Sequence, residues 1–121
     1  MGYYSEVNIA VAKRDYELLM NNIAALPDGR LKRDLYYLLA GAKIDNLDAG
    51  DLSSGEKHSY VIMHWESVKW YLEFGEVAYI ENFVKSLETY QFVRIGEVFD
   101  DIVNEILNIE VFYIKVSANL Y

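Results

Sequence analysis

The chain has 121 residues, 53% hydrophobic and 15% aromatic, which is enough apolar surface for a core and excludes a disordered chain. It has no cysteine, which excludes disulfides and thiolate metal sites, and its 19 acidic and 11 basic residues give a net charge of −8. That charge disfavours direct nucleic-acid binding, because neutralising phosphates needs clustered Lys and Arg. There is no apolar run of about 18 residues, and the first residues do not resemble a secretory signal. We therefore expect one domain over residues 1–121, no membrane association and a cytoplasmic location.

The first half of the chain predicts a strand, two helices and a second, shorter strand. Apolar side chains alternate over residues 3–12, which is typical of a half-buried strand. Residues 13–25 and 31–42 have apolar stripes at helical spacing, and a turn sequence with proline and glycine separates them. We expect a short strand at residues 44–47 and, because glycines and serines follow, a flexible loop at residues 49–56.

The middle of the chain predicts a central strand and a third helix. Residues 57–65 have apolar side chains on both faces of an extended segment, which suits the centre of a sheet. The aromatic residues 68–71 fit no single element. Residues 76–88 predict a helix with a buried stripe of apolar side chains and a solvated face that includes Glu81 and Lys85.

The last third predicts two strands on either side of an ambiguous acidic segment. Residues 90–96 predict a strand, residues 99–107 fit a helical turn or an irregular acidic loop, and residues 109–116 predict the last strand. Helices and strands mix without a regular alternation, so we predict an α+β domain. We expect a mostly antiparallel sheet of four to five strands covered by two to three helices, in a ferredoxin-like arrangement with an additional strand.

Acidic and aromatic side chains are concentrated in the second half, where residues 66–110 contain ten acidic residues and three basic ones. Trp and Tyr are common at binding hot spots, and an acidic surface attracts a basic partner. In an extended segment two neighbouring side chains face opposite ways, so one of the adjacent Trp and Tyr is expected to be exposed. The candidate binding residues are Trp70, Tyr71, Glu97, Asp100, Asp101 and Glu105. A surface that only keeps the protein in solution is the competing interpretation.

The same carboxylates allow a second hypothesis, because carboxylate oxygens at this density can bind Mg²⁺ or Ca²⁺. The calcium-loop pattern, the glycine-rich phosphate loop and the common nucleophile motifs are all absent from the sequence. His58 and His64, the only histidines, would lie about 20 Å apart on an extended strand, too far to share a metal. We expect no catalytic residue, no metal site and no cofactor. A metal-dependent enzyme acting on nucleotides or nucleic acid remains the alternative.

Three short blocks of sequence, in the same order, resemble a group of small proteins encoded by bacteriophages and prophages. The resemblance covers about the first hundred residues in scattered blocks, which are Met1-Gly2-Tyr3-Tyr4-Ser5, Val68-Lys69-Trp70-Tyr71, and Phe92-Val93-Arg94-Ile95-Gly96-Glu97 followed by Phe99-Asp100-Asp101-Ile102. It transfers no functional residue, because the blocks define no established site.

The resemblance implies a small acidic accessory protein of a phage or prophage, and such proteins often inhibit host defence, as anti-CRISPR proteins do. We therefore expect a non-catalytic inhibitor that binds a basic host protein which handles nucleic acid, and that blocks DNA or RNA from it. Its location would be the cytoplasm of an infected or lysogenic bacterium. A self-associating accessory protein is a further alternative, since an exposed strand at residues 109–116 would pair with a second copy in a homodimer.

Overall fold

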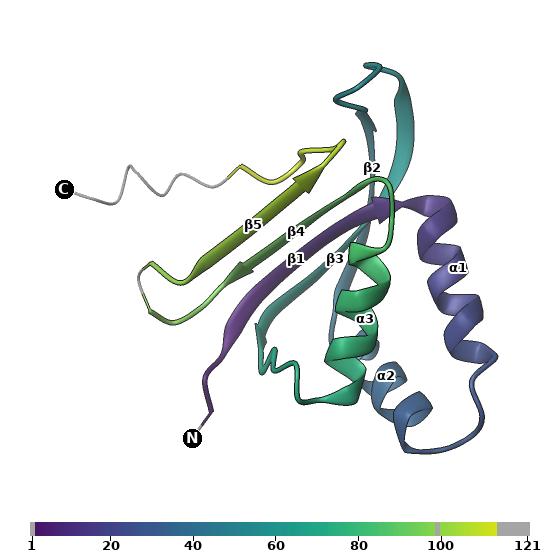
Figure 1. Cartoon of the computed structure of the whole chain (residues 1–121), viewed down its shortest axis with the longest axis vertical. Coiled ribbons are helices and arrows are strands. Elements are labelled where there is room, and N and C mark those ends of the chain that lie inside the picture. The colour runs from purple at the N-terminus through teal and green to yellow at the C-terminus, as the bar shows by residue number, and fades with distance from the viewer. Residues whose placement is uncertain (1, 99, 114–121) are drawn as a thin grey trace.

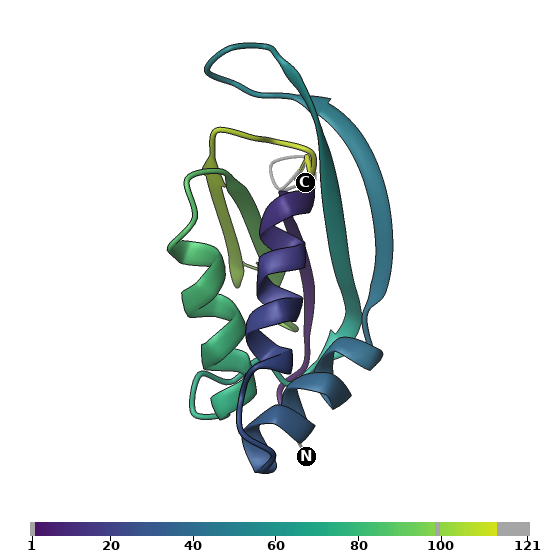
Figure 2. The ribbon, with the colours of Figure 1, turned by 90° about the vertical axis from the view of Figure 1, so that its right-hand side faces the viewer.

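The computed structural model describes residues 2–98 and 100–113, and within them three helices pack on one five-stranded sheet (Figure 1). In chain order the elements are β1 (Ser5–Ala12), α1 (Lys13–Ala24), α2 (Arg30–Ala40), β2 (Lys43–Gly50), β3 (Lys57–Val68), α3 (Gly75–Lys85), β4 (Tyr90–Ile95) and β5 (Ile102–Leu107). Figures 1 and 2 together show all three helices on the same side of the sheet. In this part of the chain no helix has the length and apolarity needed to span a membrane.

The strands lie in the order β2-β3-β1-β4-β5, and each neighbouring pair is antiparallel. Two helices connect β1 to β2, a hairpin connects β2 to β3, and α3 connects β3 to β4. This confirms the predicted α+β class with a mostly antiparallel sheet. The first four strands have an order and direction consistent with a ferredoxin-like arrangement, and β5 is the additional strand at one edge.

The main core lies between the helices and one face of the sheet. In register with one another, Val7, Ile9 and Val11 of β1 face Trp65, Met63 and Val61 of β3, as the alternating pattern predicted. The helices cover them with side chains that are nearly all inaccessible to solvent, namely Leu19, Ile23, Leu35, Val77, Ile80 and Val84. Burying each such side chain stabilises the fold by about 1.5–3 kcal/mol.

The segment that follows β5 covers part of the opposite face of the sheet, at β4. The fully buried side chain of Gln91 accepts hydrogen bonds from the backbone N–H groups of Val111 and Phe112, at 2.7 and 2.9 Å. Its Nε2 donates to the Phe112 carbonyl and to Asn104 Oδ1, both at 2.9 Å. We call residues 108–113 the strap. It covers the outer face of β4 at Gln91.

Two predictions for the last third of the chain are wrong. The segment expected to be a helical turn or acidic loop contains strand β5, because pairing with β4 organises an apolar pattern too short to recognise alone. Residues 109–113 form no strand, because Asn108 has a positive φ of 64° and turns the chain out of the sheet. The rest of the predicted last strand, residues 114–116, lies outside the described residues. Within the described residues, the edge strands are therefore β2 and β5.

Candidate functional site

A groove between α3 and the β4–β5 pair contains two of the six predicted binding residues, Trp70 and Glu105. It has a volume of about 310 Å³ and is lined by Trp70, Leu72, Glu81, Lys85, Phe92, Arg94, Val103 and Glu105. Trp70 is only 7% exposed and packs against Trp65 and Phe92, with ring centroids 5.2 and 6.2 Å apart. Trp70 therefore belongs to the core, and its partly buried neighbour Tyr71 is the more accessible of the pair.

Glu81 was predicted to be solvated, and this is wrong, because its side chain turns into the groove and the residue is 8% exposed. The indole N–H of Trp70 donates to Glu81 Oε1 at 2.8 Å, and Lys85 Nζ donates to Glu81 Oε2 at 2.9 Å. The hydrogen bond to Glu81 raises the pKa of Lys85, although burial opposes it. Helical spacing places residue 81 beside the apolar stripe, but it cannot reveal an indole that arrives from another segment.

Glu105 lies on the other wall of the groove and completes its charge network. Lys85 Nζ is 3.6 Å from Glu105 Oε2, and the Tyr90 hydroxyl donates to Glu105 Oε1 at 3.4 Å. Burial raises the pKa of Tyr90, and the negative charge of Glu105 adds to that effect. Within the groove, Lys85 thus lies between the carboxylates of Glu81 and Glu105 and offsets their negative charge.

Asp101 forms a bidentate ion pair with Arg94 across the β4–β5 turn. Arg94 donates from both terminal nitrogens to the two carboxylate oxygens, at 3.0 and 3.1 Å, and the Tyr3 hydroxyl donates to Oδ2 at 2.6 Å. The hydrogen bonds from Arg94 and then Tyr3 lower the pKa of Asp101. A Cβ at Gly96 would lie 2.2 Å from the Tyr3 hydroxyl, so this approach requires glycine.

The N-terminal segment, residues 2–4, forms hydrogen bonds with two more of the predicted binding residues, Tyr71 and Glu97. The backbone N–H of Tyr3 donates to the Tyr71 hydroxyl and that of Tyr4 donates to Glu97 Oε2, both at 2.6 Å. Tyr71, Glu97 and Asp101 therefore all contact the N-terminal segment, and these polar atoms bind the protein's own chain. Sequence reasoning missed this role, because the partners are 68 to 98 positions apart.

Some acidic groups at this end of the sheet have no cationic partner. Asp100 is exposed, and Glu66, Glu73 and Glu97 lie at or beyond the same ends of β3 and β4. Among the described residues, none of the four has a Lys or Arg nitrogen within 4.0 Å. We call these four residues, Glu66, Glu73, Glu97 and Asp100, the acidic end.

The geometry gives no support to the divalent-metal hypothesis. The four carboxylates of the predicted cluster separate, since Glu97 meets Tyr4, Asp101 meets Arg94 and Glu105 meets Lys85, while Asp100 is exposed. In residues 2–98 and 100–113, no group of three or more His, Asp and Glu side chains is placed to hold a metal ion.

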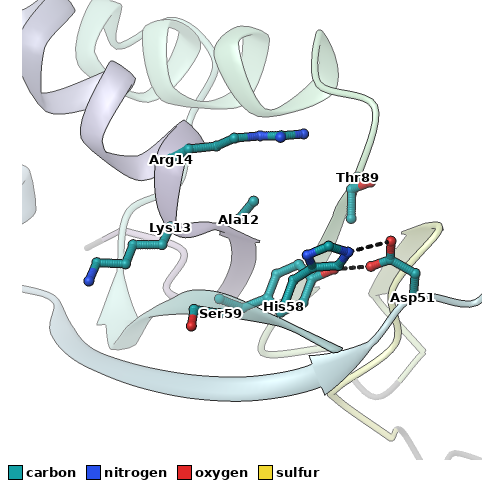
Figure 3. A pocket seen from close by; sticks show the side chains of 8 residues that line it. Ala12, Lys13, Arg14, Asp51, His58, Ser59 and Thr89 are labelled. Carbon is teal, nitrogen blue, oxygen red and sulfur yellow. Dashed lines mark hydrogen bonds and ion pairs between the residues drawn. The ribbon is translucent and has the colours of Figure 1, made fainter. Parts of the chain in front are cut away.

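A second region, at the opposite end of the sheet, was not predicted. We call it the hairpin pocket; it has a volume of about 240 Å³ and is lined by Ala12, Lys13, Arg14, Asp51, His58, Ser59, Tyr60 and Thr89 (Figure 3). His58 Nε2 lies 3.3 Å from Asp51 Oδ2, and the Tyr60 hydroxyl donates to Asp51 Oδ1. Burial raises the pKa of Tyr60, and its hydrogen bond to Asp51 raises it further. In the sequence, this pocket is indicated by the close spacing of Asp51, His58 and Tyr60 around a turn. His64 lies elsewhere, 3.0 Å from Glu6.

Comparison with known proteins adds no relative from which a role could be inferred. Neither the family models nor the curated proteins nor the solved structures gave a match to this chain. The resemblance to phage and prophage proteins therefore stays a prediction, and function has to be argued from the geometry of the two regions.

Proposed function

We propose that this protein is a non-catalytic binding protein whose acidic end docks on a basic surface of a partner that handles nucleic acid. The observation that supports this most is the set of exposed carboxylates, Glu66, Glu73, Glu97 and Asp100, without a cationic partner among the described residues. Arg94, at the same end of the sheet, is instead paired with the half-buried Asp101. A net charge of −8 would speed the encounter with such a partner.

Inhibition would follow from competition for the same surface. A basic cleft that binds DNA or RNA does so largely through phosphate neutralisation, so carboxylates docked on it exclude the nucleic acid. The acidic end is attached to a frame fastened by the Arg94–Asp101 pair and the hydrogen bonds of Tyr3, so little backbone order has to be gained on binding.

The biological setting that we propose rests on the sequence resemblance to phage and prophage proteins. It is inhibition of a host defence complex, in the manner of anti-CRISPR proteins, in the cytoplasm of an infected or lysogenic bacterium. The acidic surface and the absence of a recognisable catalytic motif support a blocking protein over an enzyme.

The test compares two triple variants with the same net charge. One carries Glu66→Gln, Glu73→Gln and Asp100→Asn at the acidic end, and the control carries Glu17→Gln, Asp45→Asn and Glu88→Gln at exposed positions elsewhere. Glu97 is kept because it holds Tyr4. Partners captured from bacterial lysate are identified, and each variant is titrated against the purified partner in competition with DNA.

We expect the acidic-end variant to lose about tenfold or more in affinity and the control to lose much less. Affinity should also fall as salt rises, because the attraction between exposed charges is screened. Equal losses in both variants would mean that only net charge matters. No loss in either would contradict the proposed docking surface.

A homodimer is a second proposal, supported by the position of β5 at the edge of the sheet within the described residues. Ile106 and Leu107 of this edge strand are 40% and 44% exposed. Unpaired strand edges with apolar side chains pair readily with a second copy. Sedimentation over a wide concentration range tests this, and a monomer at every concentration would rule it out.

A further inference from the structure

The hairpin pocket is assembled from three segments that are distant in the sequence, residues 12–14, 51–60 and 89. Ala12 ends β1, Arg14 lies in the first turn of α1, Asp51 begins the β2–β3 connection, His58 lies on β3 and Thr89 precedes β4. Figure 3 shows Arg14 and Thr89 on one side of the cavity and His58 with Asp51 on the other. The site lies at the far end of β1 from the acidic end, roughly 23 Å away along the strand.

The charge of this pocket is unusual for an acidic protein. Lys13 and Arg14 line it, and neither has a carboxylate oxygen within 4.0 Å among the described residues. The one lining carboxylate, Asp51, is engaged by His58 and Tyr60. Two cations without a partner beside a cavity produce a positive potential that favours an anion.

His58 is oriented for a ligand by the groups behind it. Its Nε2 faces Asp51 at 3.3 Å and Glu56 at 3.9 Å, which leaves Nδ1 available to a ligand. The imidazole is 46% exposed, whereas the Asp51 carboxylate is 16% exposed. A protonated imidazole would use one N–H on Asp51 and the other on a bound anion.

Thr89 provides a hydroxyl donor on the opposite wall. Asn108 Nδ2 donates to Thr89 Oγ1 at 3.2 Å, so the hydroxyl proton is available for another acceptor. Asn108 also fastens the hairpin, since its carbonyl accepts from the Leu52 N–H at 2.9 Å and its Oδ1 from the Ser53 N–H at 2.8 Å. The strap therefore holds two walls of the pocket in place before any ligand arrives, which lowers the entropy lost on binding.

We infer that the hairpin pocket binds a small phosphorylated anion, held by Arg14, His58 and Thr89. Donors on different walls of the cavity suit the tetrahedral oxygens of a phosphoryl group better than a planar carboxylate. Arginine and hydroxyl groups are common phosphate ligands. The volume of about 240 Å³ accommodates a phosphate with a small organic substituent. Free phosphate and the phosphate of a nucleotide share this chemistry, and the experiment separates them.

The experiment titrates the full chain with inorganic phosphate, adenosine monophosphate and acetate at matched ionic strength, by NMR and by thermal unfolding. We expect saturable shifts of backbone signals from residues 12–14, 58 and 89, together with a rise in melting temperature. Tighter binding of the nucleotide would assign part of the affinity to its organic part. Equal binding of both would show that the phosphoryl group alone is recognised.

The matched variants are Arg14→Gln in the pocket and Arg33→Gln on an exposed face of α2. Arg14→Gln should weaken phosphate binding tenfold or more, whereas Arg33→Gln should leave it unchanged. His58→Gln provides a second variant that tests the same site from the other wall. The inference fails if no phosphorylated compound binds below about 10 mM, if acetate binds as well, or if the two arginine variants lose affinity equally.

Discussion

The two ends of the sheet use charged side chains in different ways. Where β1 begins, Arg94 binds Asp101 through two hydrogen bonds, and in the neighbouring groove Lys85 binds Glu81 at 2.9 Å. Where β1 ends, Arg14 lines the hairpin pocket. Among the described residues, no carboxylate oxygen lies within 4.0 Å of its side-chain nitrogens. Arg94 at the first end therefore holds the chain together, whereas Arg14 at the second end is available to a ligand.

This difference shows that charge density in a sequence and charge available for binding are separate quantities. The segment from Glu97 to Glu105 is the densest acidic group in the sequence. Two of its four carboxylates, those of Asp101 and Glu105, form ion pairs within the molecule. The positively charged pocket arises from scattered residues that look unremarkable in the sequence. Removing Arg94 should therefore lower stability, whereas removing Arg14 should weaken ligand binding with little effect on stability.

The largest expected effect is that of Glu81→Leu in the groove. It leaves the buried Trp70 N–H without its acceptor at 2.8 Å and removes the closest partner of Lys85. We expect a loss of about 2–3 kcal/mol in the free energy of unfolding, measured by urea denaturation. The control Glu88→Leu, at an exposed position after α3, should change it by less than about 0.5 kcal/mol. Similar values for the two variants would show that the groove contributes little to stability.

The next effect concerns the strap at the other end. Asn108→Ala removes the side-chain hydrogen bonds to Ser53 and Thr89 and leaves an alanine at a φ of 64°. We expect a loss of about 2 kcal/mol in the free energy of unfolding, shared between the lost bonds and backbone strain.

The variant Asn108→Gly separates these two causes, because glycine tolerates a positive φ. It should lose about half as much stability as the alanine variant. If the pocket depends on the strap, both variants should also bind phosphate more weakly. Unchanged phosphate affinity would show that the walls hold their position without Asn108.

A smaller effect is expected from Asp101→Asn, and it should depend on pH. Arg94 and Tyr3 lower the pKa of Asp101 in the folded protein, so the stability that the carboxylate adds is present above its unfolded pKa. That contribution is lost as pH falls through the lowered folded value. The melting temperature of the variant should therefore lie below that of the unchanged protein near pH 7, and the difference should begin to shrink only below about pH 4. The neighbouring Asp100→Asn, which is exposed, should show no difference at either pH.

Much of the fold could be predicted from the sequence, because its strands and helices have strong patterns of their own. The alternation in β1 and β3 and the stripe of Val77, Ile80 and Val84 in α3 all matched the structure. Strand β5 could not be predicted, because its six residues become a strand only by pairing with β4. Asn108 has a positive φ and ends the sheet; asparagine adopts such angles more often than most residues, but the apolar residues after it favoured a strand.

The candidate sites were less predictable, because their geometry depends on contacts between distant segments. Composition identified the acidic carboxylates, but it could not show that Asp101 binds Tyr3, 98 positions away. It also could not show that Trp70 would bury Glu81. The hairpin pocket had only a local signal, since Asp51 and His58 flank a turn, while Arg14 and Thr89 arrive from elsewhere.

The smallest expected effect is that of Arg14→Gln on stability, and it tests the comparison most directly. A side chain without an internal partner contributes little to the folded state, so the free energy of unfolding should change by less than about 0.5 kcal/mol. Arg94→Gln, the matched change at the other end, should clearly lower the melting temperature, since Asp101 loses two hydrogen bonds. If Arg14→Gln destabilised the protein as much as Arg94→Gln, Arg14 would have a structural partner and the contrast between the ends would not hold. An arginine that is dispensable for folding but required for phosphate binding would be the signature of a ligand site.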